Sequence, residues 1–204
     1  MRMLESGSRL LGTNSKVELS ATQQPAELNK NQLGLMESDM CILVNEEGEL
    51  MGSVSKKDSH VFSAVRPRGE LHRAFSVFLF NEDNKLLLQQ RAAEKITFPQ
   101  VWTNTCCSHP LVGMTPDEVD TDADVRAGRV MGVKHAAVRK LQQELGIRSE
   151  DIPVKDFKYL TRLHYWAADI VTHGKKAPWG EHEIDYILFI KVTLTLTPAL
   201  TLTL

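Results

Sequence analysis

The sequence has few cysteines, almost no net charge and no long apolar run. Its 204 residues include 3 cysteines, and the adjacency of Cys106 and Cys107 excludes a bridge between those two. An odd cysteine count therefore argues against a disulfide framework and favours a reducing compartment. With 24 Lys and Arg against 26 Asp and Glu, the net charge of −2 gives no reason to expect a nucleic-acid partner. No apolar run approaches the roughly 18 residues of a membrane span, so we expect none.

Residues 1–38 are rich in Ser, Thr, Asn and Gln and lack helical or strand periodicity, which predicts a flexible N-terminal arm. Arg2, Arg9 and Lys16 give the arm a faint likeness to a transit peptide, but we interpret it as a disordered leader. The cytoplasm is the expected location, with peroxisome or plastid as alternatives. The rest of the chain has the length of one medium domain.

Apolar runs beyond the arm predict two β-hairpins. Residues 40–44 and 50–54 flank the polar turn 45–48, and residues 74–80 and 86–88 flank the polar loop 81–84. Residues 113–128 carry two glycines, a proline and five acids, which indicates a surface loop with a helical turn after Thr115-Pro116.

The second half of the chain predicts one long helix and two further strands. Apolar residues recur on one face of residues 130–145, and Gly146 stands where a helix ends. Residues 159–166 and 181–192 indicate strands joined by a Gly/Lys/Pro loop at 173–180. The predicted fold class is therefore α/β or α+β, with a mixed β-sheet packed against helices.

The last residues, 193–204, alternate Thr and Leu, a period of two that is typical of a strand. We interpret them as a low-complexity tail without chemistry, and Pro198 would confine any such strand to a sheet edge.

Residues 181–185 place three carboxylates, Glu181, Glu183 and Asp185, at alternate positions. On a strand these side chains share one face, where they repel one another, while His182 and Ile184 point to the other. A solvated face and a cation site explain the pattern equally well.

Cys107-Ser108-His109 lies in a segment dense in small hydrogen-bonding residues. The spacing lacks the paired Cys-x-x-Cys of a structural zinc site. A thiol beside an imidazole can exchange protons near neutrality if its pKa is lowered, whereas Cys106 is expected to be buried and inert.

Basic and histidine residues in three further segments complete the candidate set. Lys56, Arg91 and Lys95 suit a diphosphate, and His60 and His72 suit a metal. Taken singly, each is also consistent with surface charge or a satisfied histidine.

Five blocks of sequence together resemble type I isopentenyl-diphosphate Δ-isomerases, a family of the Nudix superfamily. In order, these blocks are residues 55–60, 71–76, 88–91, 103–110 and 179–186. The likeness runs from about residue 40 to residue 191 and implies a Nudix-like isomerase domain at 39–192. Residues 139–147 fit the second half of a Nudix box, although Lys140 and Gln143 stand where Nudix hydrolases usually carry acids.

The resemblance implies a role for each candidate residue. One divalent metal, Mg²⁺, Mn²⁺ or Zn²⁺, would be held by His60, His72, His109, Glu181 and Glu183. Glu144 would help to hold a second Mg²⁺ on the substrate diphosphate. The substrate-binding residues would be Lys56, Arg91, Lys95, Ser108 and Lys140. The catalytic residues would be Cys107 and Glu183, with Tyr165 as their partner.

The implied activity is the interconversion of isopentenyl and dimethylallyl diphosphate in isoprenoid biosynthesis, by proton transfer through a tertiary carbocation. The implied partner is this small diphosphate, and we expect a monomer. In the family the chain continues into a further strand and helices bearing a tryptophan that closes the pocket, and here the Thr/Leu tail stands in that region. Two alternatives remain: a truncated, inactive isomerase that only binds metal or diphosphate, and a Nudix pyrophosphohydrolase.

Overall fold

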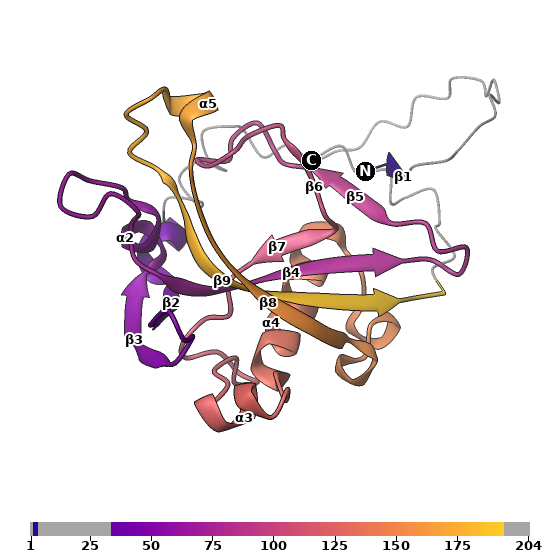
Figure 1. Ribbon diagram of the computed structural model, residues 1–204. Coiled ribbons are helices and arrows are strands. Elements are labelled where there is room, and N and C mark those ends of the chain that lie inside the picture. The colour runs from indigo at the N-terminus through magenta and orange to yellow at the C-terminus, as the bar shows by residue number, and fades with distance from the viewer. Residues whose placement is uncertain (1, 4–33, 194–204) are drawn as a thin grey trace, which may run out of the picture.

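The computed structural model describes residues 2–3 and 34–193, and a curved, mixed β-sheet forms the centre of this part of the chain (Figure 1). The strand order is β3-β2-β4-β9-β8, and β7 pairs with the edge of β4 that faces away from β9. These strands are β2 (Met40–Val44), β3 (Leu50–Ser55), β4 (His72–Phe80), β7 (Cys106–Ser108), β8 (Lys158–Ala168) and β9 (Gly180–Lys191). A mixed sheet packed with helices, as predicted, is confirmed.

Smaller elements surround this sheet. A second sheet contains β1 (Arg2–Met3), β5 (Leu87–Gln90) and β6 (Trp102–Thr103). The helices are α2 (Lys56–His60), α3 (Asp122–Arg126), α4 (Met131–Leu145) and α5 (Ile170–His173), with 3₁₀ turns at Ser149–Asp151 and Val154–Asp156. None of the described helices is long and apolar enough to cross a membrane.

The central strands β4 and β9 run parallel, whereas the other pairs in the sheet are antiparallel. His72 is opposite Glu183, and Ser76 is opposite both Ile187 and, across the other edge of β4, Cys107. Because side chains alternate along a strand, His72 and Ser76 share one face with Glu183 and Cys107. The other face of β4 and β9 carries buried apolar residues that belong to the main core with α4.

Helix α4 supplies most of the helical part of that core. Its buried residues Val133, Ala137 and Leu141 are separated by four positions, so they lie on one face. The helix ends at Gly146, whose φ of 66° is a left-handed conformation that favours glycine. The sequence prediction for this helix is confirmed.

The first predicted hairpin is confirmed, since β2 and β3 pair antiparallel. The second is wrong in part. β4 and β5 touch only through an isolated bridge between Phe80 and Leu86, and β5 then pairs with β6 in the smaller sheet. The helical segment in the 113–128 loop also begins at Asp122, later than a turn directly after Thr115-Pro116.

The two predicted terminal segments fall largely outside the described residues. Within the predicted arm, residues 34–38 are helical and Met36 is buried. Residues 4–33 of the arm and 194–204 of the Thr/Leu tail are outside the part of the chain that the structure describes.

Val130, the residue at the N-terminal cap position of α4, makes no side-chain capping hydrogen bond. Asp120, which lies outside the helix, caps it instead. The buried Asp120 carboxylate accepts hydrogen bonds from the backbone N–H groups of Gly132 at 2.7 Å and Val133 at 3.0 Å. We expect Asp120→Ala to lower the free energy of unfolding by about 1–2 kcal/mol, measured by urea denaturation, because two backbone donors lose their acceptor. Asp83→Ala, at an exposed turn, is the control, and equal loss in both variants would contradict the capping role.

Candidate metal centre and active site

Three histidines and two glutamates converge where β4, β7 and β9 meet α2. Each can offer one ligand atom, and these five atoms all lie within 4.8 Å of one another. The residues are His60, His72, His109, Glu181 and Glu183. They are the five residues that the resemblance implies as ligands of one metal, brought together from sequence positions more than 120 residues apart.

Strand register explains the convergence. His72 begins β4 directly opposite Glu183 of β9, and His109 follows β7 on the other side of β4. His60 ends the short helix α2, which Ser55 caps by accepting a hydrogen bond from the Asp58 backbone. The sequence reading treated residues 56–60 as a basic segment and missed this helix, although a serine three residues before an aspartate is a capping signal.

Backbone carbonyls orient two of the imidazole rings. His60 Nδ1 lies 2.6 Å from the Lys56 carbonyl, and His72 Nδ1 lies 2.8 Å from the Glu70 carbonyl. Each Nδ1 therefore carries the proton, which leaves Nε2 with a free lone pair. His60 Nε2 is 2.8 Å from Glu181 Oε2. His72 Nε2 is buried without a hydrogen-bond partner and lies 3.7 Å from Glu183 Oε1.

Burial keeps two histidines of the cluster, His72 and His109, neutral. Burial, with the nearby histidines, lowers the pKa of His72 to about 3 and that of His109 well below its ordinary value. Burial acts to raise the pKa of Glu181, but His60 holds it at about 2. Burial and the neighbouring Glu181 raise the pKa of Glu183 well above its ordinary value.

This donor set fits a divalent cation. Neutral imidazoles and carboxylates are the N/O ligands that Mg²⁺, Mn²⁺ and Zn²⁺ use in different proportions. The unpartnered Nε2 of His72 and the buried carboxyl group of Glu183 are costly without a cation. The backbone bonds to Nδ1 supply the outer contacts that ligating histidines usually have. The site is therefore compatible with a divalent metal of unspecified identity.

Glu183 has a further partner, Tyr165, whose hydroxyl donates a hydrogen bond to Oε2. The pairing of Tyr165 with Glu183 across β8 and β9 aligns them. Burial, followed by Glu183 itself, raises the pKa of Tyr165, so the phenol stays protonated as a donor. Asp185, which lies two residues after Glu183 on β9, accepts a hydrogen bond from Ser76 Oγ at 2.8 Å.

Cys107 lies on the same face as Ser76, and both Glu183 and Glu181 act on it electrostatically. Burial raises its pKa to about 11, although Arg91, whose Nη1 is 3.7 Å from Sγ, acts in the opposite direction. The sequence hypothesis made proton exchange depend on a lowered pKa, and in this respect it is wrong. Without metal or substrate the group is a neutral thiol.

Four predicted substrate-binding cations lie near one another, and one of them, Arg91, contacts Cys107. The pKa of Lys95 is lowered by burial and by the charges of Lys140, Arg91 and Lys56, which shows that these charges share one region. Glu144 is among them, 2.9 Å from Lys140 Nζ. Burial opposes it, but Lys140 and Lys95 lower the pKa of Glu144 to about 2. Glu144 is outside the five-residue cluster, consistent with a separate role.

Ser108 is placed differently from the other predicted contacts. Its pairing with Phe75 puts its side chain on the α4 face of the sheet, opposite to Cys107. Cys106 is on that face too, fully buried, with Sγ 3.7 Å from Glu144 Oε2. Cys106 is therefore placed as the sequence analysis expected for an inert cysteine.

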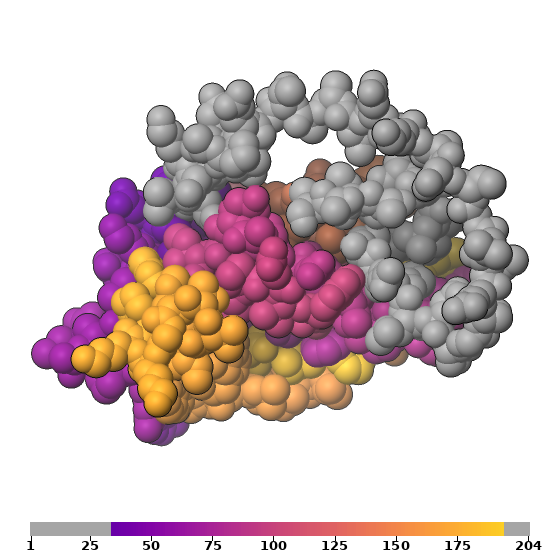
Figure 2. Space-filling model, turned by 90° about the horizontal axis from the view of Figure 1, so that it is seen from above, coloured from indigo at the N-terminus to yellow at the C-terminus, as the bar shows by residue number. Residues whose placement is uncertain are grey.

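Sequence reasoning missed Asp169, which forms a hydrogen bond to the loop that carries Arg91 and Lys95. Buried Asp169 accepts hydrogen bonds from the backbone N–H of Phe98 at 2.7 Å and of Thr172 at 3.0 Å. In Figure 2 the pink segment before residue 100 lies against the orange β8–β9 connection. The only sequence signal is an Asp before a short helix, which is too common to identify such a contact.

The chain is similar to known proteins over most of its length. The NUDIX domain model matches residues 70–201. The chain is 51% identical to the isopentenyl-diphosphate delta-isomerase of Gibberella zeae over 82% of its length, covering 61% of that protein. It is 49% identical to isopentenyl-diphosphate delta-isomerase 1 of Bos taurus over 84% of its length, covering 69% of that protein. It is 47% identical to the isopentenyl-diphosphate delta-isomerase of Schizosaccharomyces pombe over 88% of its length, covering 74% of that protein.

The chain spans about three fifths of the length of the first fungal relatives that it matches. Among solved structures, a Deinococcus radiodurans protein is 15% identical, with a TM-score of 0.47 over 76% of this chain and 74% of that one. The family model and the bovine and fission-yeast relatives decide the assignment: this chain belongs to the NUDIX family and, within it, to the isopentenyl-diphosphate delta-isomerases.

Proposed function

We propose that the protein interconverts isopentenyl and dimethylallyl diphosphate. The observation that carries the proposal is that two groups able to transfer protons, Cys107 and Glu183, lie on one face of the sheet, Glu183 within the five-residue cluster and Cys107 beside the Arg91 guanidinium. The fungal and bovine relatives are named as isopentenyl-diphosphate delta-isomerases. We propose the cytoplasm and a monomer, and three free cysteines support a reducing location.

The cations define where the diphosphate would bind. Lys56, Arg91, Lys95 and Lys140 would neutralise its negative charge, with Lys95 held in a partly desolvated position that strengthens the attraction. Glu144 is the carboxylate within this group and the residue that we propose to hold Mg²⁺ against the diphosphate. This arrangement would leave the isoprenoid tail to extend toward Cys107 and Glu183.

The reaction needs one proton donated to an alkene carbon and another removed two carbons away, through a tertiary cation. We assign Cys107 to one face of the alkene and Glu183 to the other. Tyr165 would position Glu183 through its hydroxyl. When bound, the divalent metal would offset the charge of the glutamates and set the ionisation of Glu183.

Metal binding should release a proton from Glu183. Its raised pKa means that the carboxyl binds a proton near neutrality when the metal is absent, whereas a metal ligand must be ionised. Metal affinity should therefore increase with pH, and we expect about one proton released per Zn²⁺ at pH 7. Calorimetry in two buffers of different ionisation enthalpy measures this number. No release, or undiminished release from Glu183→Gln, would show that Glu183 is already ionised.

A pyrophosphohydrolase is not favoured. Nudix hydrolases carry further acids in the segment that contains Glu144, whereas here Lys140 lies 2.9 Å from that single carboxylate and Gln143 is uncharged. The remaining carboxylate is thus balanced by a lysine rather than by neighbouring acids that would assemble several metal ions.

Incubation with isopentenyl diphosphate and Mg²⁺ in D₂O tests the proposal. Formation of dimethylallyl diphosphate with deuterium incorporation is the expected result, followed by mass spectrometry or NMR. Release of inorganic phosphate would indicate hydrolase chemistry instead. Binding of the diphosphate without any deuterium exchange would overturn the catalytic proposal and leave a non-catalytic binding protein.

A further inference from the structure

We infer that His164 and His182 form a further metal site, selective for transition metals, on the face of β9 opposite to the five-residue cluster. Trp166 is opposite His182 and His164 is opposite Ile184, so these side chains share one face of β8 and β9. The two Nε2 atoms are 3.1 Å apart while the ring centroids are 5.3 Å apart. The rings therefore converge at their Nε2 ends.

That separation suits two ligands of one ion. With metal–nitrogen bonds of about 2.0–2.1 Å, two nitrogens 3.1 Å apart subtend an angle of about 100° at the metal, between octahedral and tetrahedral values. Imidazole pairs favour Zn²⁺, Ni²⁺ and Cu²⁺ over Mg²⁺. His164 is exposed and His182 is half-buried, so water can complete the coordination from the His164 side.

The other histidines are engaged elsewhere. All seven histidines of the chain are among the described residues. Three belong to the buried cluster, and His135 and His173 each contact a backbone carbonyl, of Asp117 at 3.1 Å and Ile96 at 2.8 Å. Among the described residues, His164 and His182 are therefore the pair of imidazoles whose ring nitrogens face each other in reach of solvent.

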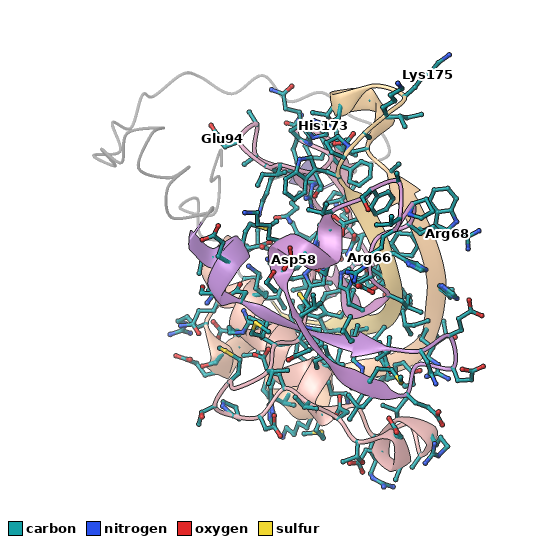
Figure 3. The ribbon with its side chains drawn as sticks, turned by 90° about the vertical axis from the view of Figure 1, so that its left-hand side faces the viewer. Asp58, Arg66, Arg68, Glu94, His173 and Lys175 are labelled. Carbon is teal, nitrogen blue, oxygen red and sulfur yellow. The ribbon has the colours of Figure 1, made fainter. Side chains whose placement is uncertain are left out.

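The surroundings carry charges of both signs. His182 interacts electrostatically with the negative charge of Glu46 and with the positive charge of Arg68. The Arg68 guanidinium, labelled in Figure 3, lies over the Trp166 ring at 5.2 Å. Trp166 is thus an optical reporter next to the histidine pair.

An ion here would tie β8 to β9. Within the described sheet β8 is an edge strand, paired with β9 alone. His164 and His182 immediately precede Tyr165 and Glu183, which meet on the opposite face. Metal at the pair would therefore fix the strand register behind the Tyr165–Glu183 contact, without touching substrate.

Retention of the untagged full chain on immobilised Ni²⁺ tests the site, because the buried cluster cannot reach a resin. We expect retention of the unmodified protein, and elution of His164→Gln at about tenfold lower imidazole, since one of two linked ligands is lost. His135→Gln is the matched control and should elute with the unmodified protein. Co-elution of His164→Gln with the unmodified protein, or no retention of either, would overturn the proposal.

Cu²⁺ quenching of tryptophan fluorescence tests the site without altering a histidine. Cu²⁺ at the pair should quench Trp166, so the unmodified protein should lose more fluorescence than Trp166→Phe, which keeps Trp102 and Trp179. Mg²⁺ should quench neither. Equal fractional quenching of both proteins by Cu²⁺ would overturn the proposal independently of the proposed isomerase activity.

Discussion

Replacement of Cys107 by alanine should lower isomerase turnover by about a thousandfold or more. A positioned acid or base contributes roughly 10²–10⁴-fold, and the isomerisation has only two such groups to divide between its two proton transfers. Cys107 is held as a thiol, with a pKa of about 11 that burial sets, so alanine removes an available proton and supplies no substitute. Steady-state turnover of isopentenyl diphosphate under saturating Mg²⁺ measures the effect.

The adjacent cysteine provides the matched control. Cys106→Ala changes the same atoms one residue away, but on the α4 face of the sheet, where the thiol is fully buried. We expect a modest loss of stability and a turnover close to that of the unmodified protein. Near-normal turnover of Cys107→Ala, or equal losses in both variants, would remove Cys107 from the chemistry.

Local pattern predicted much of the fold. The four-residue spacing along α4 and the glycine after it identify the helix, and the alternating acids of residues 181–185 place Glu181 and Glu183 on one face of a strand. These signals depend only on the period of a helix or strand, which sequence reveals directly. The five metal-type residues follow from the resemblance to a family rather than from such periods.

Nonlocal pairing could not be predicted in the same way. Whether β5 continues the hairpin of β4 or joins another sheet depends on tertiary contacts. The same holds for Ser108, because a shift of one residue in the register of β7 would move it to the other face. The hydrogen bond from the Phe98 backbone N–H to Asp169 joins residues 71 positions apart, and no local sequence pattern encodes it. The raised pKa of Cys107 likewise results from burial, a property of the assembled fold.

Glu183→Gln should cost more than any other single change to the cluster, because this side chain serves two roles. Its carboxylate belongs to the five-residue cluster, with Oε1 2.9 Å from His109 Nε2. It is also the second proton-transfer group in the proposed reaction. Glutamine keeps the shape and can still accept a hydrogen bond from Tyr165, but it cannot exchange a proton near neutrality. We expect turnover to fall by about 10³-fold or more and metal affinity to fall by at least tenfold.

Tyr165→Phe separates the two roles. It removes the hydroxyl that positions Glu183 and leaves every metal-type residue in place. Turnover should therefore fall by a smaller factor, about tenfold, while Zn²⁺ affinity changes little, and Tyr159→Phe, whose ring packs against Tyr186, is the matched control. Dialysis against graded Zn²⁺ and turnover assays on the same preparations give both quantities. If Glu183→Gln kept its turnover while losing metal affinity, Glu183 would be a metal ligand only, and the second proton transfer would belong to another group.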